Sequence, residues 1–199
     1  MVGPTGSGKT PLGTICEQKG LWGRKCYHFD FGAALREIAK KGVRPASLTD
    51  EDAHIIVRVL KSSALLENEY FHIARKIIMS FAEEKRIEKD DLLILNGLPR
   101  HLGQAGEIDE IIDIRMIVYL ECKPEIVSQR IRFNSGGDRS ERSDDSLEAV
   151  EKKLKIFHDR TFPLLSYFRS RQTRIEEITV SVNTTPEEIH HGLECKQIL

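Results

Sequence analysis

The sequence predicts an α/β domain in which helices flank a parallel sheet. Residues 92–95 (LLIL) and 114–120 (IRMIVYL) are almost continuously apolar, which is typical of strands whose two faces are both covered. A shorter apolar run at residues 25–29 (KCYHF) is interpreted as a further strand, and segments with helical spacing separate these runs. Alternating strands and helices imply right-handed crossovers and therefore parallel strands.

A glycine-rich run opens the chain. It reads Gly-Pro-Thr-Gly-Ser-Gly-Lys-Thr from Gly3 to Thr10, which is the pattern G-x-x-x-x-G-K-[ST] of the phosphate-binding P-loop. Lys9 supplies an ammonium group for the β and γ phosphates, and the Thr10 hydroxyl can ligate Mg²⁺. A turn that matches by chance is the competing interpretation, and the fixed spacing disfavours it. The motif therefore predicts the P-loop NTPase fold and an ATP site formed by Pro4, Thr5, Gly6, Ser7, Gly8, Lys9 and Thr10.

The segments on either side of the P-loop lead to two expectations. Residues 10–19 are predicted to form a helix whose N-terminus also attracts the anion, and Pro11 is tolerated in its first turn. A buried strand should run into the loop, yet only Met1 and Val2 precede Gly3. We therefore expect the first strand to be truncated and the true start of the chain to lie upstream of Met1.

Size, charge and cysteine content exclude several classes of function. The chain has 199 residues, enough for one α/β domain, and 30 basic residues against 31 acidic ones. No overall charge therefore favours a nucleic acid polymer or a membrane as partner. The four cysteines form no C-x-x-C pair, so neither a zinc site nor a disulfide framework is indicated. No signal peptide and no apolar run of about 18 to 20 residues is present, so a cytoplasmic protein is expected.

The segment after the first predicted strand is predominantly helical. Helical spacing covers residues 31–40, and Gly42 and Pro45 interrupt it. Thr49 followed by three acidic residues starts a second helix, because a hydroxyl cap and early acids both stabilise a helix N-terminus. A third helix is predicted from Tyr70 to Phe81, before a charged run.

The second half of the chain combines helices with one polar loop. Pro124 starts a helix, and residues 133–142 form a glycine-containing loop that carries arginines. Asp145-Ser-Leu-Glu148 resembles a capping box that opens a long helix, which Pro163 should kink or end. Residues 179–182 are predicted to form the last strand, and Thr185-Pro-Glu-Glu starts a final helix.

Four further motifs occur in a fixed order after the P-loop. They are Phe31-Gly-Ala-Ala-Leu-Arg36, Asn96-Gly-Leu-Pro-Arg100 with Gln104-Ala105, the arginine-bearing loop from Arg130 to Arg142 that continues as Ser-Asp-Asp, and Thr161-Phe-Pro-Leu164. In this order and spacing, over nearly the whole chain, the sequence resembles the adenylate kinase family of nucleoside monophosphate kinases. The P-loop alone is shared with many unrelated ATPases, whereas the ordered set is much more specific.

The resemblance implies a role for each basic residue. Phosphoryl transfer between two nucleotides brings negative charges together, so catalysis rests on alignment and charge neutralisation, and arginine grips phosphate with a planar fork. The residues implied to be catalytic are Lys9, Arg100, Arg130, Arg142 and Lys153. Those implied to bind the monophosphate are Gly32, Arg36, Gly97, Arg100 and, against its base, Gln104. Thr10 and, through water, Asn96 would hold Mg²⁺.

Several positions depart from the family pattern. Asn96 stands where the family has aspartate, so a charge that helps to hold hydrated magnesium is lost. Lys153 stands where the family has arginine, which loses the bidentate grip on phosphate. Ala33 replaces an aspartate, and Phe31 replaces a small residue beside the base, where packing is favoured over stacking. The loop after Arg130 is too short for a zinc-carrying lid, so a short-lid form is implied.

The predicted function is reversible phosphoryl transfer from Mg²⁺·ATP to a nucleoside monophosphate, AMP first and CMP or UMP next. The whole chain, 1–199, is predicted to be one domain with an acceptor lobe at residues 31–84 and a lid at residues 133–142, and the resemblance implies a monomer. Two alternatives stay open. Asn96, Ala33 and Lys153 favour a nucleotide-binding regulator that has lost catalysis, and a kinase acting on a small non-nucleotide acceptor is the weaker alternative.

Overall fold

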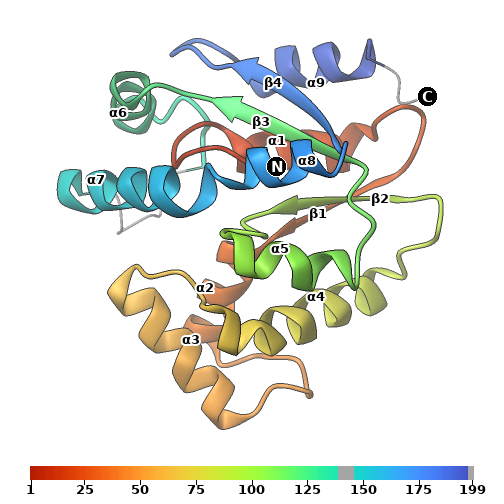
Figure 1. The fold of residues 1–199 in the computed structure, drawn as a ribbon, viewed down its shortest axis with the longest axis vertical. Helices are drawn as coiled ribbons and strands as arrows, with labels where there is room; N and C mark the ends of the chain where they lie inside the picture. Colours follow the sequence, from red (N-terminus) through yellow and green to blue (C-terminus); the bar gives the residue numbers. More distant parts are fainter. Residues whose placement is uncertain (139–145, 197–199) are drawn as a thin grey trace.

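The computed structural model describes residues 1–138 and 146–196 and contains two pairs of parallel strands. β1 (Cys26–Asp30) pairs with β2 (Leu92–Asn96), and β3 (Met116–Glu121) pairs with β4 (Arg174–Thr179). Helices surround both pairs, as Figure 1 shows. The predicted fold class, a P-loop α/β domain with parallel strands, is confirmed.

The first two residues link the strand pairs. The Val2 nitrogen donates to the Val118 carbonyl and the Val2 carbonyl accepts from the Leu120 nitrogen, both at 2.9 Å, which makes a parallel bridge to β3. The Met1 nitrogen donates to the carbonyl of Leu95 in β2 at 2.5 Å. Met1 and Val2 therefore occupy a strand position between β2 and β3, directly before the P-loop, where a buried strand is expected.

Both faces of β3 are covered by helices. Val118 and Leu120 lie in a buried cluster with residues of α1, α6 and α9, whereas Ile117 and Tyr119 lie in another cluster with residues of α5 and α8. Alternate residues of a strand point to opposite faces, so this division explains the continuous apolar run. The bounds are α1 (Lys9–Lys19), α5 (Leu102–Asp109), α6 (Pro124–Arg132), α7 (Leu147–Ile156), α8 (Leu164–Ser170) and α9 (Pro186–Glu194).

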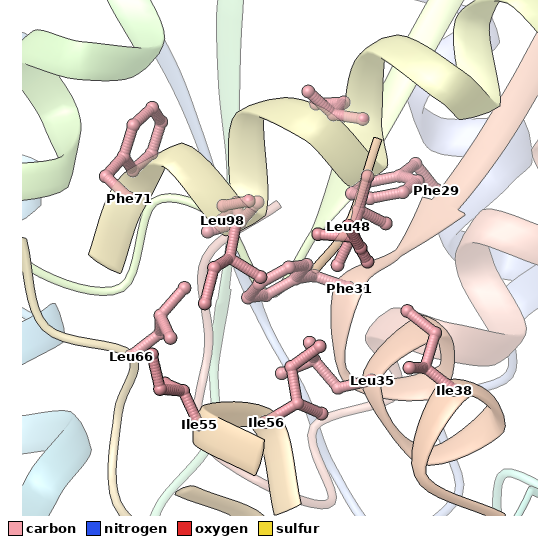
Figure 2. Packing of buried hydrophobic residues seen from close by; sticks show 14 of the residues in the cluster. Phe29, Phe31, Leu35, Ile38, Leu48, Ile55, Ile56, Leu66, Phe71 and Leu98 are labelled. Carbon is pink, nitrogen blue, oxygen red and sulfur yellow. The ribbon is translucent and has the colours of Figure 1, made fainter. Parts of the chain in front are cut away.

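Three further helices, α2 (Phe31–Lys41), α3 (Asp50–Ser62) and α4 (Phe71–Lys85), share a core with β1 and β2. Figure 1 shows them together at the end of the molecule away from α9, and Figure 2 shows their packing around Phe31 and Leu98. Phe31 is 4 % exposed, and its ring lies 6.3 Å from that of Phe29. The expectation that Phe31 packs is therefore confirmed, and this buried cluster joins α2, α3 and α4 to the sheet.

Helix caps follow the sequence signals. Thr49 and Asp52 form a reciprocal capping box at α3, and Thr185 does the same with Glu188 at α9. At α7 the Ser146 side chain accepts from the Ala149 nitrogen at 3.2 Å. The predicted box began at Asp145, which lies outside the described residues. The start of each of these helices is thus determined locally, by one side-chain oxygen and a backbone N–H group.

Three sequence predictions about elements need correction. The last strand is β4 (Arg174–Thr179) rather than residues 179–182, because this strand is polar and partly exposed on both faces and gives no apolar run. The long helix is interrupted, since α7 leads into a π-helical turn, η2 (Phe157–Thr161), before Pro163 caps α8. Helix α5 was not predicted.

Within the described ranges, no helix combines the length and apolarity needed to cross a membrane.

Candidate active site

A cavity opens at the carboxyl ends of β1 and β2, the edge where open α/β sheets bind ligands. The P-loop, the start of α2, the end of α3, the segment after β2 and helix α7 surround it. The predicted site residues among its lining are Thr5, Gly6, Gly8, Lys9, Thr10, Gly32, Arg36, Asn96, Gly97, Arg100, Gln104 and Lys153. The structure therefore brings the predicted donor and acceptor residues into a single cavity.

The P-loop backbone has the conformation that its glycines permit. Gly6 has φ 76° and Gly8, the residue before α1, has φ 99°, both in the region that favours glycine. The Lys9 ammonium donates to the carbonyls of Gly3 and Pro4 at 2.7 Å each. Ser7 is fully buried beneath the loop. Lys9 thus lies across the loop and in the lining of the cavity.

Arg130 braces the P-loop instead of facing the cavity. Its Nε donates to the Gly6 carbonyl at 3.1 Å, and its Nη1 donates to three carbonyls of the turn before α9, those of Ser181, Val182 and Thr184, at 2.7 to 3.2 Å. The residue is 3 % exposed and is absent from the cavity lining. Backbone carbonyls thus hold Nε and Nη1 of the guanidinium, and the role of Arg130 toward the transferring phosphoryl group stays a prediction.

A polar cluster joins the P-loop to the ends of β1 and β2. The Thr10 hydroxyl donates to Asp30 Oδ2 at 2.7 Å. Asn96 Nδ2 donates to the same oxygen at 2.7 Å and approaches the Thr10 hydroxyl at 3.0 Å. Asp30 and Asn96 are register partners in neighbouring parallel strands, so their side chains end at the same edge. Sequence reasoning missed Asp30, whose only signal was an acidic residue at the carboxyl end of a predicted strand.

These three residues fit a hydrated magnesium ion. They offer hydroxyl, carboxylate and amide oxygens, the ligands that Mg²⁺ prefers, and Mg²⁺ in nucleotide sites keeps several waters and uses only one or two carboxylates besides the phosphates. In the part of the chain that the structure describes, no group of three or more His, Cys, Asp and Glu could hold a metal ion. The donor set therefore suits a cation that arrives with a nucleotide.

The two predicted acceptor arginines line the cavity on the side of α2 and the segment after β2. The Arg36 guanidinium passes so close to Gly32 that a Cβ there would lie 3.3 Å from Nη1. Burial lowers the pKa of the Arg100 guanidinium, and the Asp30 carboxylate partly opposes this. Arginine nonetheless keeps its charge at neutral pH. Arg36 and Arg100 thus add two permanent positive charges to that of the P-loop lysine.

Gln104 has both ends of its amide engaged inside the protein. Its Oε1 accepts from the Arg100 nitrogen at 2.8 Å, and its Nε2 donates to the Leu66 carbonyl at 2.8 Å. The side chain is fully buried. Gln104 therefore ties the backbone at Arg100 to the segment between α3 and α4, and its contact with a nucleotide base stays a prediction.

Of the last two predicted catalytic residues, Lys153 and Arg142, only Lys153 lies among the described residues. Lys153 extends from α7 into the lining of the cavity, together with Asp138 of the segment after α6. Arg142 lies outside the described residues, with the rest of the last part of the predicted lid, residues 139–142. Lys153 is thus the one predicted cation that α7 contributes to the described site.

Comparisons with known proteins agree with this geometry. A family model described as an AAA domain matches residues 2–151. The chain is 26 % identical over 176 residues to an adenylate kinase of Prochlorococcus marinus, covering 85 % of this chain and 83 % of that one. It is 24 % identical over 195 residues to a uridylate kinase of Saccharomyces cerevisiae, covering 98 % and 87 %.

An adenylate kinase of Encephalitozoon cuniculi is 24 % identical over 196 residues, covering 98 % of this chain and 96 % of that protein. The similarity to these kinases thus extends along the whole chain and is not limited to the P-loop. The chain belongs to the family of the AAA domain model and, with these relatives, to the adenylate kinase family of nucleoside monophosphate kinases.

Proposed function

We propose that the protein transfers the γ-phosphoryl group of Mg²⁺·ATP reversibly to a nucleoside monophosphate, with AMP as the first acceptor and CMP or UMP next. One observation carries the proposal: Lys9 and Thr10 of the donor loop line the same cavity as Arg36 and Arg100. An ATPase that transfers phosphate to water needs cations for one nucleotide only. Here cations for two phosphate groups converge.

The cations divide the work of the reaction. Lys9 lies across the P-loop and neutralises the donor phosphates. Arg36 and Arg100 approach from the acceptor side and can each grip two oxygens of the monophosphate. Lys153 lines the cavity from α7 and adds a charge for the transferring group. Alignment and charge neutralisation of this kind are what a loose phosphoryl-transfer transition state requires.

The rest of the cavity supports a nucleotide as acceptor. Val59, Leu60, Leu65 and Phe157 line it beside the charged groups. A flat base needs an apolar surface of this kind, whereas a small polar acceptor does not. The relatives named adenylate and uridylate kinases act on adenylate and uridylate, which supports AMP and UMP as the acceptors to test first.

An acceptor panel tests the proposal. Purified protein is incubated with Mg²⁺·ATP and AMP, CMP, UMP or GMP, or without acceptor, and each diphosphate is quantified by ion-exchange chromatography. AMP is expected to give ADP fastest, and the reaction without acceptor is expected to release almost none. The Lys9→Met variant should lose at least about 100-fold in turnover, since one donor to the transferring charge is removed.

The nucleotide-binding regulator makes a different prediction for the same panel. It rests on Asn96, Ala33 and Lys153, which depart from the family pattern. Tight ATP binding with no diphosphate from any acceptor would refute the nucleoside monophosphate kinase and leave the regulator and the kinase with a non-nucleotide acceptor. Near-normal turnover of Lys9→Met would refute the role given to Lys9.

A further inference from the structure

The donor site has its carboxylate on a different strand from the one that the family pattern provides. Asn96, at the end of β2, is neutral where an aspartate is the family pattern. Asp30, at the end of β1, is its register partner. Both side chains reach the Thr10 hydroxyl, at 2.7 Å from Asp30 Oδ2 and 3.0 Å from Asn96 Nδ2. In this chain the carboxylate beside Thr10 therefore comes from β1, and β2 contributes a neutral amide.

We propose that Asp30 supplies the carboxylate that holds the hydrated Mg²⁺ of bound ATP, in place of the carboxylate that Asn96 lacks. The proposal rests on the proposed use of Mg²⁺·ATP and assigns the metal-holding charge to a residue outside the predicted set.

The hydrogen bonds around Asp30 Oδ2 favour this role. The Thr10 hydroxyl donates its proton to Oδ2 and accepts from Asn96 Nδ2, so one lone pair of the hydroxyl oxygen remains for a cation. A carboxylate that accepts from a ligating group in this way orients the ligand and increases its basicity. Asn96 Nδ2 donates to the same carboxylate and so fixes its position.

The helix cap uses only one of the two carboxylate oxygens of Asp30. Asp30 Oδ1 accepts from the Ala33 nitrogen at 2.8 Å and caps α2. A cap needs an acceptor oxygen but no charge, since asparagine and serine cap helices about as well. A carboxylate beside a triphosphate site also repels ATP unless a divalent cation lies between them. The charge of Asp30 is therefore unfavourable for metal-free ATP and favourable for Mg²⁺·ATP.

An exchange of side chains across the two strands tests this assignment. Asp30→Asn keeps an oxygen for the Ala33 nitrogen and removes the charge. Asn96→Asp in the same chain restores the charge on the neighbouring strand. Calorimetric titration with a non-hydrolysable ATP analogue, once with Mg²⁺ and once with EDTA, gives the gain in affinity that Mg²⁺ produces, without any turnover.

Asp30→Asn is expected to weaken binding of the analogue in the presence of Mg²⁺ but not in the presence of EDTA. Asp30→Asn should reduce the Mg²⁺-linked gain about 10- to 100-fold, while metal-free analogue should bind as tightly as before or more tightly. The double variant should recover most of the gain. A structural role would weaken binding with and without Mg²⁺ alike, and the second substitution would not rescue it.

Three results would overturn the assignment: an unchanged Mg²⁺-linked gain in Asp30→Asn, equal losses in both conditions, or a wild-type protein without any Mg²⁺-linked gain. Failure of the kinase proposal would look different, because the analogue would still bind with its Mg²⁺-linked gain while no acceptor in the panel received phosphate.

Discussion

The hydroxyl of Thr161 donates a hydrogen bond to the carbonyl oxygen of Arg100 at 2.7 Å, across 61 residues of sequence. Thr161 is buried and ends the π-helical turn η2, so the wide turn between α7 and α8 presents its hydroxyl to the segment after β2. The nitrogen of Arg100 is held as well, by Gln104. Arg100, which we propose to bind the acceptor, is thus positioned through both polar groups of its own backbone. Interruptions of this kind in helices are frequent at functional sites.

Replacing Thr161 by valine should therefore impair acceptor binding more than donor binding. The buried Arg100 carbonyl would lose its partner at a cost of about 1 to 3 kcal/mol in the free energy of unfolding. The KM for the monophosphate should rise, while the affinity for the ATP analogue stays unchanged. Urea unfolding and initial rates measure the two effects. Thr161→Ser keeps the hydroxyl and is the matched control; if it behaves like the valine variant, the hydrogen bond is not the cause.

Substitution of Arg130 distinguishes a structural role, in which it supports the P-loop, from a catalytic role in the lid. Arg130→Met leaves four carbonyls around the P-loop and the turn before α9 without a donor, so the free energy of unfolding should fall by about 1 to 3 kcal/mol or more. Arg132→Met, at an exposed position on the same helix, should change it by less than about 0.5 kcal/mol. Chemical denaturation of both variants decides the question. A large loss of turnover in Arg130→Met with an unchanged free energy of unfolding would show that Arg130 has a catalytic role.

Lys153 lines the cavity from a position where the family pattern has arginine. Lys153→Arg should raise turnover, because a planar fork can bind two oxygens of the transferring group. Lys153→Met should lower turnover about 100-fold, on the scale of removing one preorganised donor. Single-turnover rates with AMP would show both changes. Equal rates in the wild type and in Lys153→Met would exclude the residue from catalysis.

The environment of Asp52 leads to a prediction of how the free energy of unfolding changes at low pH. Burial raises the pKa of its carboxyl, but hydrogen bonds outweigh burial and hold the pKa well below its usual range. These bonds come from the Thr49 nitrogen at 3.0 Å, His72 at 2.8 Å and Lys76 at 2.9 Å. Since the folded-state pKa lies below the unfolded value of about 3.9, the stabilisation is complete above that pH and is lost as the pH falls toward the folded-state value.

Urea unfolding of the wild type and Asp52→Asn between pH 3 and pH 7 measures this effect. The difference in unfolding free energy should be largest at pH 7 and should shrink toward pH 3. Glu51→Gln, an exposed substitution in the same helical turn, should follow the wild type at every pH. A constant difference between the wild type and Asp52→Asn would contradict the lowered pKa.

Local signals were sufficient for most of the fold. Continuous apolar runs identified β2 and β3 because each is covered on both faces, and hydroxyl caps identified the starts of α3 and α9. Strand β4 gave no such signal, since its Glu176 and Glu177 stand within a partly exposed edge. Helix α5 was hidden because Gly103 and Gly106 dilute its apolar spacing. The predicted strands β2 and β3 differ from β4 and α5 in how clearly their burial shows in the sequence.

The candidate site was predictable where the chemistry is encoded in spacing. The P-loop and both acceptor arginines line the cavity as expected. The bracing contacts of Arg130 could not be predicted, because a brace and a lid cation are the same residue type on the same kind of helix. Asp30 could not be found, because its partnership with Thr10 and Asn96 depends on the register of two strands separated by three helices.

The core that α2, α3 and α4 share with β1 and β2 limits how acceptor preference can be re-engineered. Phe29 and Leu95 belong to the sheet, yet they pack in the same cluster as Phe31 and Leu98. If α2, α3 and α4 were replaced by those of a relative with another base preference, the new side chains would not fit against these residues and would leave voids or overlaps. Exchange of Phe29 and Leu95 together with the lobe is therefore required for a chimera that keeps a close-packed interior.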